Sequence, residues 1–359
     1  MQRSALAMTL AEYAAARSTH PQALRSEYVQ LFRDSTAAPL APVTRCEEHE
    51  GVVKFCLDVG SGLETESVII PMDSYRGSKW HTLCVSTQVG CRMGCTFCET
   101  GRMGLMRNLT IEEIVTQRIV ARRLRHQRTS LPTRPYSYFR DGIRNVVFMG
   151  MGEPFDNFDN LVGAIRVLNE PNGLAIPLTQ MTVSTVGRID GLQQLADIVR
   201  REPSWANLRI ALSLNASNDA VRTQIMPINK SAPLAELQRA LLDYPLARRG
   251  LYLIEYVMLA GVNDSVEDAD AVADWCRPLR CVVNLIPYNP QRDAAYATSD
   301  DATVFRFLRR LRSHGIFVKR RVTQGRNLMG ACGQLGNPEL RRPRRTNRAA
   351  GEPVDSNPA

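Results

Sequence analysis

The spacing of hydrophobic positions changes along the chain, and each spacing predicts a different kind of element. Apolar side chains recur at helical intervals around Pro21 within residues 1 to about 35, which predicts helices there. The segment STAAPLAPVT is rich in proline and small residues and predicts a linker. Two β-like runs, GVVKFCLDV and ESVIIP, flank the turn-forming residues 60–62. The amino-terminal part is therefore expected to hold helices followed by a small hairpin.

Beyond the hairpin, short β-branched runs alternate with amphipathic stretches. The expected strands are LCVSTQ, NVVFMG, MTVST, NLRIALSL, LYLIEYVML and CVVNLIPY, and the helical pattern after the last one ends near Ser313. Helices are expected from Thr110, with a capping box formed by Thr110 and Glu113, and over 160–169 and 190–200. Six consecutive βα units predict an α/β fold with a parallel sheet, either an open barrel or a doubly wound sheet.

The composition is typical of a soluble globular protein. Of 359 residues, 44% are hydrophobic and 23% are charged, and no apolar run approaches the roughly 20 residues of a membrane-spanning helix. The first residues fit a secretory signal poorly because Glu12 and Arg17 interrupt the apolar stretches. We therefore expect a cytoplasmic protein with no membrane partner and one main domain with small appendages.

Basic residues exceed acidic ones by 45 to 36, and the formal net charge is +9. Such an excess suits a polyanionic partner such as RNA. Five arginines gather in the segment LRRPRRTNR, which predicts either a solvated tail or a contact to RNA phosphates. Beyond Asn337 the sequence is polar and rich in Pro and Arg, and we expect it to be disordered.

Nine cysteines in a chain of this length are too few for a disulfide scaffold and favour metal or catalytic roles. Three of them, Cys91, Cys95 and Cys98, lie on the glycine-containing loop CRMGCTFC. Soft thiolates at this spacing suit an iron-sulfur cluster or zinc. A 4Fe-4S cluster with only three thiolate ligands keeps one iron open for the amino and carboxylate groups of a substrate. A zinc site that takes a distant fourth ligand is the alternative.

Other polar motifs follow the expected strands, at the edge where ligands bind in parallel α/β sheets. GMGEP follows the second strand, Ser184 ends the third, residues 213–215 end the fourth, and PYNP follows the sixth. Gly150 and Gly152 allow the backbone to approach a ligand closely, and Glu153 could pair with an ammonium group. We therefore expect a ligand site along this edge.

The cysteine loop resembles the signature of the radical S-adenosylmethionine (SAM) superfamily. The motifs VVFMGMGEPFDN, MTVST, ALSLNAS, IEYVML, NLIPYNP and ACGQL, in this order, resemble the RNA methyltransferases of the RlmN and Cfr family over about residues 52–337. The resemblance implies a partial (β/α)6 TIM-like barrel with a small amino-terminal accessory region. We accordingly divide the chain into a helical accessory region and linker (1–45), a β-hairpin extension (46–82), a radical SAM core (83–337) and a basic tail (338–359).

The resemblance also implies roles for particular residues. The cluster ligands are Cys91, Cys95 and Cys98. The implied SAM-binding residues are Gly152, Glu153, Ser184, Ser213, Leu214, Asn215 and Asn289. Cys332, in GACGQL, matches the cysteine that carries the methyl group, Cys84 matches the one that resolves the adduct, and Glu66 matches the proposed proton acceptor. Without the family, the two cysteines would be interpreted as buried apolar thiols and Glu66 as an ordinary edge-strand carboxylate.

The implied activity is methylation of an adenosine base in RNA. Carbon 2 of an adenosine in 23S ribosomal RNA is the expected target, with transfer RNA as a second substrate and carbon 8 as the alternative position. These ring carbons are too weakly nucleophilic to attack a sulfonium methyl group, so a radical is required. In the family's mechanism one SAM methylates Cys332, a second yields the radical that removes hydrogen from that methyl, and Cys84 releases the product by forming a disulfide. Two SAM per turnover and a flavodoxin or ferredoxin electron donor are expected.

Two other functions stay open. A radical SAM protein that modifies a protein or a small molecule would share the cluster loop, but ACGQL together with Cys84 argues against it. A non-catalytic zinc module that binds RNA would depend mainly on the basic tail. The chain departs from the family's usual sequence in having Asn215 in place of His, a longer connection over 71–80 and a short amino-terminal region.

Overall fold

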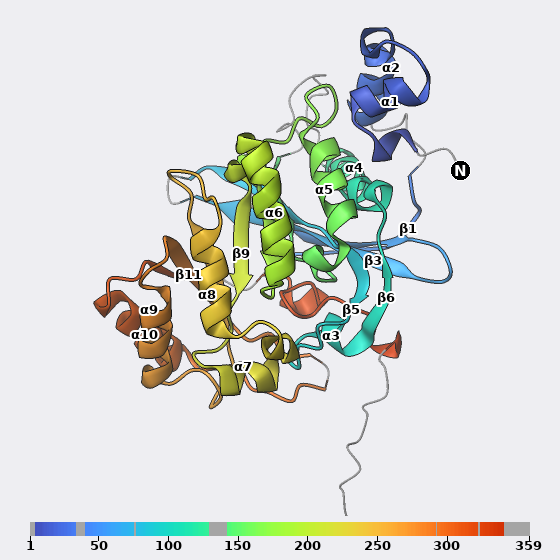
Figure 1. The fold of residues 1–359 in the computed structure, drawn as a ribbon. Helices are drawn as coiled ribbons and strands as arrows, with labels where there is room; N and C mark the ends of the chain where they lie inside the picture. Colours follow the sequence, from blue (N-terminus) through green and yellow to red (C-terminus); the bar gives the residue numbers. More distant parts are fainter. Residues whose placement is uncertain are drawn as a thin grey trace, which may run out of the picture.

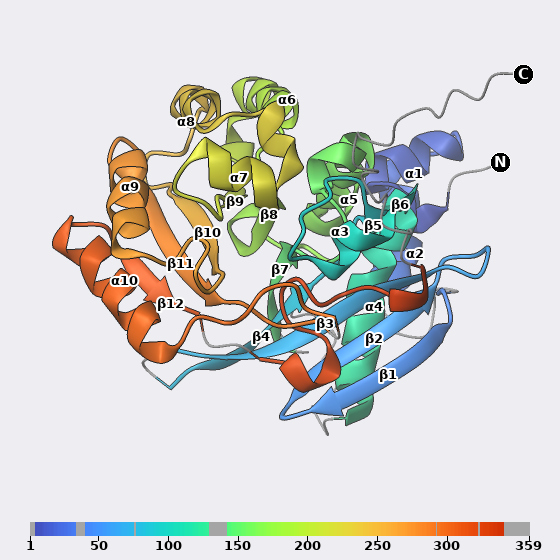
Figure 2. The same cartoon turned by 90° about the horizontal axis from the view of Figure 1, so that it is seen from below.

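A single ten-stranded sheet forms the centre of the computed structural model. The structure describes residues 4–33, 40–74, 77–128, 142–291, 293–321 and 324–340. The strand order is β1-β2-β3-β4-β7-β8-β9-β10-β11-β12, so β1 and β12 form the two edges. Figure 1 shows the helices over the outer side of the sheet, and Figure 2 shows the sheet curving around an interior that the carboxyl-terminal segment crosses beside β3.

The amino-terminal region is helical, as predicted. It consists of η1 (Ala5–Ala7), α1 (Leu10–Ala16) and α2 (Pro21–Arg33). Pro21 is the first residue of α2, where a missing N–H leaves no hydrogen bond unmade. Thr9 and Glu12 form a capping box that starts α1. Tyr28 is fully buried, and its hydroxyl donates to the carbonyl oxygen of Met8 at 2.7 Å, which fixes α2 against the preceding segment.

Four antiparallel strands follow, and they differ from the expected isolated hairpin. They are β1 (Val43–His49), β2 (Val52–Asp58), β3 (Glu64–Asp73) and β4 (Lys79–Cys84). The predicted hairpin is β2 and β3, but residues 43–45, expected in the linker, belong to β1. The sequence VTRCEEH lacks an apolar alternation because β1 is an exposed edge strand, formed by backbone pairing with β2. Since β4 pairs with β3, the hairpin is continuous with the main sheet.

The parallel part of the sheet confirms the six predicted βα units. Its strands are β4, β7 (Ile143–Phe148), β8 (Met181–Thr185), β9 (Arg209–Ser213), β10 (Tyr252–Met258) and β11 (Cys281–Pro287). The first strand lies earlier than predicted, because β4 ends at Cys84 and shares only Leu83 and Cys84 with LCVSTQ. A seventh parallel strand, β12 (Val318–Arg320), was not predicted, because three residues are too few to show a period. With the helices outside the curve, the architecture is the expected partial barrel and not a doubly wound sheet (Figure 2).

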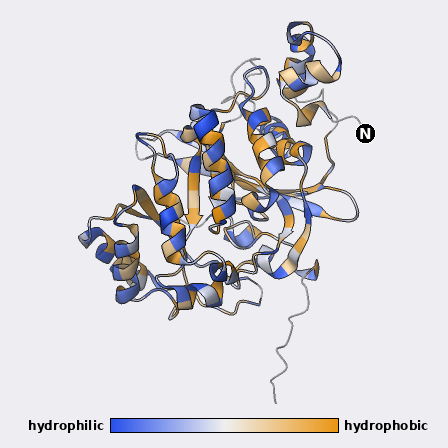
Figure 3. Ribbon diagram, viewed as in Figure 1, coloured by the Kyte–Doolittle hydropathy of each residue, from blue (hydrophilic) through white to orange (hydrophobic). Residues whose placement is uncertain are grey.

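In the described part of the chain, seven helices cover the barrel. They are α4 (Ile111–Arg128), α5 (Phe158–Asn169), α6 (Ile189–Arg201), α7 (Asp219–Ile225), α8 (Leu234–Asp243), α9 (Val266–Cys276) and α10 (Asp301–Ser313). The four for which the sequence predicted a bound, α4, α5, α6 and α10, agree with it within about two residues. The expected capping box is present: Glu113 N donates to Thr110 Oγ1 at 3.3 Å and Thr110 N to Glu113 Oε2 at 2.8 Å. Figure 3 shows hydrophobic and hydrophilic colours side by side on α6 and α8, as expected for helices with one buried face.

A separate two-stranded sheet, β5 (Gln88–Cys91) with β6 (Gly104–Asn108), and the short helix α3 (Glu99–Met103) follow β4. Within the described ranges, no helix is both long and apolar enough to cross a membrane. The arginine-rich segment and nearly all of the expected tail lie outside the described residues. The division of the chain into four parts stays a prediction.

Candidate active site

The three clustered cysteines lie together on one loop. Cys91 ends β5, and Cys95 and Cys98 lie on the turn that leads into α3. Apolar side chains, including Met93 and Phe97, surround them. Burial raises the pKa of all three thiols, and the neighbouring thiols raise the pKa of Cys91 and Cys95 further. A bound cationic group is therefore needed to keep three thiolates in this place.

The arrangement of the thiols suits a cluster. Among the residues that the structure describes, no group of three or more His, Cys, Asp or Glu side chains is placed to hold a single metal ion. A 4Fe-4S cluster does not need such convergence, because each cysteine binds a different iron atom. Backbone contacts hold the loop: Thr96 N donates to Ile225 O at 3.0 Å, and Glu99 N donates to Gly333 O at 2.8 Å. The residues present therefore fit the cluster.

Gly90 keeps β5 and β6 close enough to form this loop. Its φ is +74°, a conformation that side chains disfavour, and an added Cβ would overlap the carbonyl oxygen of Gly104. Gly261 offers a matched comparison, because its φ is +70° and nothing lies within 4 Å of an added Cβ. The two glycines share the backbone strain but differ in the space around them.

We expect Gly90→Ala to destabilise the protein by about 3 kcal/mol, because strain and steric overlap add, and to impair cluster assembly. Gly261→Ala should cost roughly 1 kcal/mol, from strain alone. Guanidinium titration of cluster-free protein measures both values. Equal free energies of unfolding for the two variants would show that the overlap at Gly90 is relieved without cost.

Gly152 and Glu153 lie on the loop that follows β7. The Glu153 side chain links this loop to the segment after β8. Glu153 is 1% exposed, and its carboxylate accepts hydrogen bonds from Phe155 N at 3.1 Å and Val186 N at 2.9 Å. Burial raises the pKa of Glu153 to about 7, although these donors oppose the shift. A Cβ on Gly152 would lie 2.6 Å from the side chain of Gln88. A buried carboxyl group therefore stands beside the cysteine loop, where a positively charged group would find a partner.

The other expected SAM-binding residues lie at neighbouring strand ends. Ser184 is opposite Ala211, and Ser213 is opposite Glu255, so β8, β9 and β10 end side by side. Leu214 is buried and donates its N–H to Glu255 O at 3.0 Å. These positions share one edge of the barrel with Glu153.

Asn215 makes its hydrogen bonds within the protein. Its Oδ1 accepts from Val257 N at 2.9 Å, and its Nδ2 lies 3.3 Å from the sulfur of Met226. Its φ is +57°, in the left-handed region, where Asn is better tolerated than most residues. The residue at this position therefore shapes the end of β9, and a contact with SAM stays a prediction.

Arg222 is a residue of the site that sequence reasoning missed. It is fully buried on α7, and its guanidinium donates to the carbonyl oxygens of Val186 at 2.7 Å and Leu214 at 3.0 Å. Burial lowers the pKa of Arg222 to about 10, and the charge of Cys95 opposes that shift. The arginine thus joins two strand ends and supplies a positive charge near the thiols. Its only signal in the sequence was an arginine within a short segment of mixed polar and apolar residues.

Cys84 and Cys332 lie within electrostatic range of each other although they are far apart in the sequence. Cys84 ends β4, and Cys332 lies between η6 (Arg326–Leu328) and η7 (Pro338–Leu340). Both are free thiols. Burial raises the pKa of Cys84 to about 12, and the charge of Cys332 acts in the same direction. Asn289 Nδ2 donates to Cys332 O at 3.2 Å, so Asn289 holds the segment that bears this thiol.

A second missed cation, Arg321, follows β12 and faces both thiols. The charges of Cys332, Glu255 and Cys84 raise its pKa, with Cys332 contributing most. Its Nη1 lies 4.0 Å from Glu255 Oε2. β12 was absent from the predicted elements, so the sequence provided no reason to place Arg321 here. Its positive charge acts to lower the pKa of Cys84, against the larger effect of burial.

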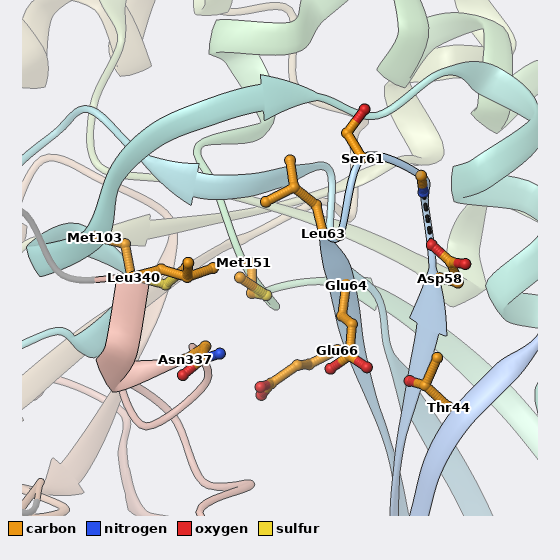
Figure 4. Close-up of a pocket in the computed structure, with 12 residues that line it drawn as sticks. Thr44, Asp58, Ser61, Leu63, Glu64, Glu66, Met103, Met151, Asn337 and Leu340 are labelled. Carbon is orange, nitrogen blue, oxygen red and sulfur yellow. Dashed lines mark hydrogen bonds between the residues drawn. The ribbon is translucent and has the colours of Figure 1, made fainter.

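Glu66 lies on β3 beside a cavity of about 440 Å³. Figure 4 shows its side chain pointing into this cavity, with Asn337 across from it. Met151, from the GMGEP motif, and Met103 also line the cavity. Glu66 Oε2 forms an ion pair with Lys54 Nζ at 2.8 Å and accepts a hydrogen bond from Gly336 N at 3.2 Å. The cavity therefore joins the hairpin to the loop that follows β7.

Comparison with known proteins identifies the family. The family model described as "Radical SAM superfamily" matches residues 85–276. The "Probable dual-specificity RNA methyltransferase RlmN 1" of Protochlamydia amoebophila is 40% identical over 289 residues, which cover 80% of this chain and 74% of that protein. The chain belongs to the RlmN and Cfr family of the radical SAM superfamily.

Two further members of this superfamily support the assignment. The "Dual-specificity RNA methyltransferase RlmN" of Syntrophotalea carbinolica is 37% identical over 321 residues, covering 89% of this chain and 78% of that protein. The crystal structure of a radical SAM methyltransferase from Sphaerobacter thermophilus superposes with a TM-score of 0.79 at 33% identity, covering 92% of this chain and 98% of that one. The RlmN and Cfr family uses a 4Fe-4S cluster and SAM, so the expected fold, family and cofactors are confirmed. The roles of individual residues stay predictions.

Proposed function

We propose that this enzyme methylates an adenosine base in RNA through a methyl-cysteine carrier. The names of the relatives support RNA as the substrate. The observation that carries the proposal is that two free thiols, Cys84 and Cys332, lie within electrostatic range of each other, with Glu66 on the same face of the sheet as Cys84. A radical SAM enzyme without a cysteine carrier would not need this pair. Carbon 2 of an adenosine in 23S ribosomal RNA is the proposed target, with transfer RNA as a second substrate.

The cofactors would occupy the edge of the barrel described above. Cys91, Cys95 and Cys98 would bind the cluster. Residues at the strand ends would hold SAM, namely Gly152, Glu153, Ser184, Ser213, Leu214, Asn215 and Asn289. When bound and reduced by a flavodoxin or ferredoxin, these cofactors supply the radical that removes hydrogen from the methyl group on Cys332. Two SAM would be consumed per turnover, one for the methyl group and one for the radical.

Cys332 first accepts a methyl group. Its thiolate forms a bond to the sulfonium methyl carbon of SAM as the bond from that carbon to the sulfonium sulfur breaks, which yields S-adenosylhomocysteine. Arg321 interacts electrostatically with Cys332, so a cation lies near the sulfur that takes part in this step. Asn289 holds the backbone beside Cys332 so that the methyl group stays near the strand ends.

Product release uses Cys84 after the methylene carbon is joined to the base. Glu66 accepts the proton that leaves the ring carbon, and the surplus electron that radical addition leaves on the ring would return to the oxidised cluster, which restores the aromatic base. The Cys84 thiolate then attacks the Cys332 sulfur: a disulfide forms, the bond from sulfur to the methylene carbon breaks, and its electron pair takes up a proton to complete the methyl group. An external thiol must reduce the disulfide before the next turnover.

Mass spectrometry of RNA tests the function directly. Ribosomal and transfer RNA from cells with and without the protein are digested and analysed for methyladenosines, and the purified holoenzyme is assayed on unmodified RNA. We expect 2-methyladenosine at one position of 23S RNA only when the protein is present. 8-Methyladenosine would replace the carbon-2 assignment by carbon 8. The absence of both, with an intact cluster, would overturn RNA methylation.

A further inference from the structure

Lys54 is a buried cation that the reaction scheme above does not use. It lies in the middle of β2 and is 7% exposed. Its ammonium group forms an ion pair with Glu66 Oε2 at 2.8 Å and donates to Met329 O at 3.1 Å. Burying an ammonium group costs free energy unless charged and polar partners compensate. Lys54 is therefore placed to act on Glu66 and on the segment that leads to Cys332.

The strand register puts these groups on one face of the sheet. Lys54 pairs with Val68, and Val68 pairs with Cys84. Side chains directly opposite each other in a sheet project to the same side, and so do residues two apart along one strand. Glu66, two residues before Val68, therefore shares a face with both Lys54 and Cys84. An added Cβ on Gly330 would lie 3.6 Å from Val68, so the segment that leads to Cys332 passes over this same face.

The two carboxylate oxygens of Glu66 have different surroundings. Oε2 forms the ion pair with Lys54 and accepts from Gly336 N at 3.2 Å. Among the described residues, the polar partner of Oε1 is the half-exposed Arg45, at 3.9 Å. The carboxylate lies beside the cavity, into which the side chain points (Figure 4). Oε1 is thus the oxygen that can accept a proton from a base placed there.

Other ionisable groups around Glu66 do not replace Lys54. Asp58 and Glu64 line the same cavity and carry no positive charge. Cys56 is opposite Glu66 on β2, and burial raises the pKa of that thiol, so it stays in its neutral form. Arg45 is more distant, and half of its side chain is exposed to solvent. Lys54 is the close, buried positive charge.

We infer that Lys54 is a positioning residue for Glu66: it keeps this buried carboxyl group ionised and turns Oε1 toward the RNA base. The inference rests on the proposed role of Glu66 as proton acceptor. As the ring C–H bond breaks, the proton passes to Oε1 and the bonding electron pair stays with the ring, while Lys54 remains an ammonium. The surplus electron left by radical addition would return to the oxidised cluster. Through its hydrogen bond to Met329 O, the same ammonium also holds Glu66 and the segment that bears Cys332 in one arrangement.

The test isolates proton removal from product release. In a Cys84→Ala background the protein-RNA adduct accumulates, and Cys84 no longer contributes to the pH dependence. RNA with deuterium on the target carbon is then used, and mass spectrometry of the adduct measures the rate of deuterium loss between about pH 6 and about pH 9. Four variants are compared: Lys54→Met, Lys54→Gln, Lys54→Arg and, as a control on the exposed part of β4, Lys79→Met.

Without the ammonium, the neutral form of Glu66 is favoured, so proton removal should need a higher pH. We expect the Met and Gln variants to lose deuterium at least about tenfold more slowly than the parent at neutral pH, and the rate to recover as pH rises. In a plot of this rate against pH, the acidic limb should move to higher pH by roughly one unit or more. Lys54→Arg and Lys79→Met should keep the profile of the parent. Methylation of Cys332, measured on its peptide, should be unchanged in all four.

Each other outcome counts against the inference. Equal slowing at every pH, with the limb in place, would assign Lys54 a purely structural role. A Lys54→Gln profile identical to the parent would do the same even if Lys54→Met does not fold, because Gln keeps a donor for Met329 without the charge. If the parent forms no adduct and the wild type no methyladenosine, the proposed function itself has failed, which is a distinguishable result.

Discussion

Replacing Cys91, Cys95 and Cys98 together by Ala should abolish the iron-sulfur cluster and with it all RNA methylation. The thiols are buried among apolar side chains, and burial raises their pKa, so the bound iron atoms are what hold them as thiolates. Alanine has no side-chain atom that can bind iron, and within the described residues no nearby group of side chains can replace the three thiolates. Iron and acid-labile sulfide, measured after anaerobic reconstitution, should fall to background.

Cys46→Ala provides the matched control, because Cys46 is a half-buried thiol on the edge strand β1, away from the cysteine loop. It should retain the iron and sulfide content of the wild type. Circular dichroism should show that the triple variant still folds, since the barrel core does not depend on these side chains. Full iron and sulfide in a folded triple variant would refute the assignment of the cluster ligands.

Cys84→Ala should trap a covalent protein-RNA adduct, whereas Cys332→Ala should form none. Without Cys332 there is no methyl carrier, so no bond to RNA is made and SAM is cleaved little. Without Cys84 the carrier is still methylated and can still join the base, but no thiol is positioned to break the sulfur bond. A denaturing gel without added dithiols shows the adduct, and peptide mass spectrometry of wild-type protein should find part of Cys332 methylated.

The wild-type release step should also accelerate as pH rises. Burial raises the pKa of Cys84 to about 12, so the attacking thiolate is scarce at neutral pH and its share grows about tenfold with each pH unit below that value. Cys281→Ala, at a half-buried thiol on β11, is the matched control and should turn over normally. Normal turnover of Cys84→Ala with no adduct would show that Cys84 is only a packed strand residue.

Features that depend on local spacing could be predicted from the sequence. The alternation of β-branched runs with amphipathic stretches predicted six parallel strands and their helices, and all six are present. β1 and β12 were missed for different reasons: β1 is too polar to show an apolar period, and β12 is too short to show any period. Both form because a neighbouring strand supplies backbone partners, a contribution that no local pattern records.

The grouping of the site residues was decided at two different levels. Cys91, Cys95 and Cys98 lie close in sequence, so one loop brings them together whatever the rest of the chain does. Glu66 and Cys84 could be chosen only by resemblance to a family, because each on its own is an ordinary strand residue. The register of β3 against β4 is what places them on one face.

The sequence by itself determined the order of elements, the cysteine loop and the family, because periodicity and short motifs act within a few turns or one loop. Only the tertiary structure decided that Lys54 pairs with Glu66, that Arg222 joins two strand ends near Cys95 and that Arg321 faces Cys84 and Cys332. These cations come from separate strands and helices. Their partners depend on long-range strand pairing and chain crossing, and their effect on charge depends on burial, which exists only once the barrel has formed.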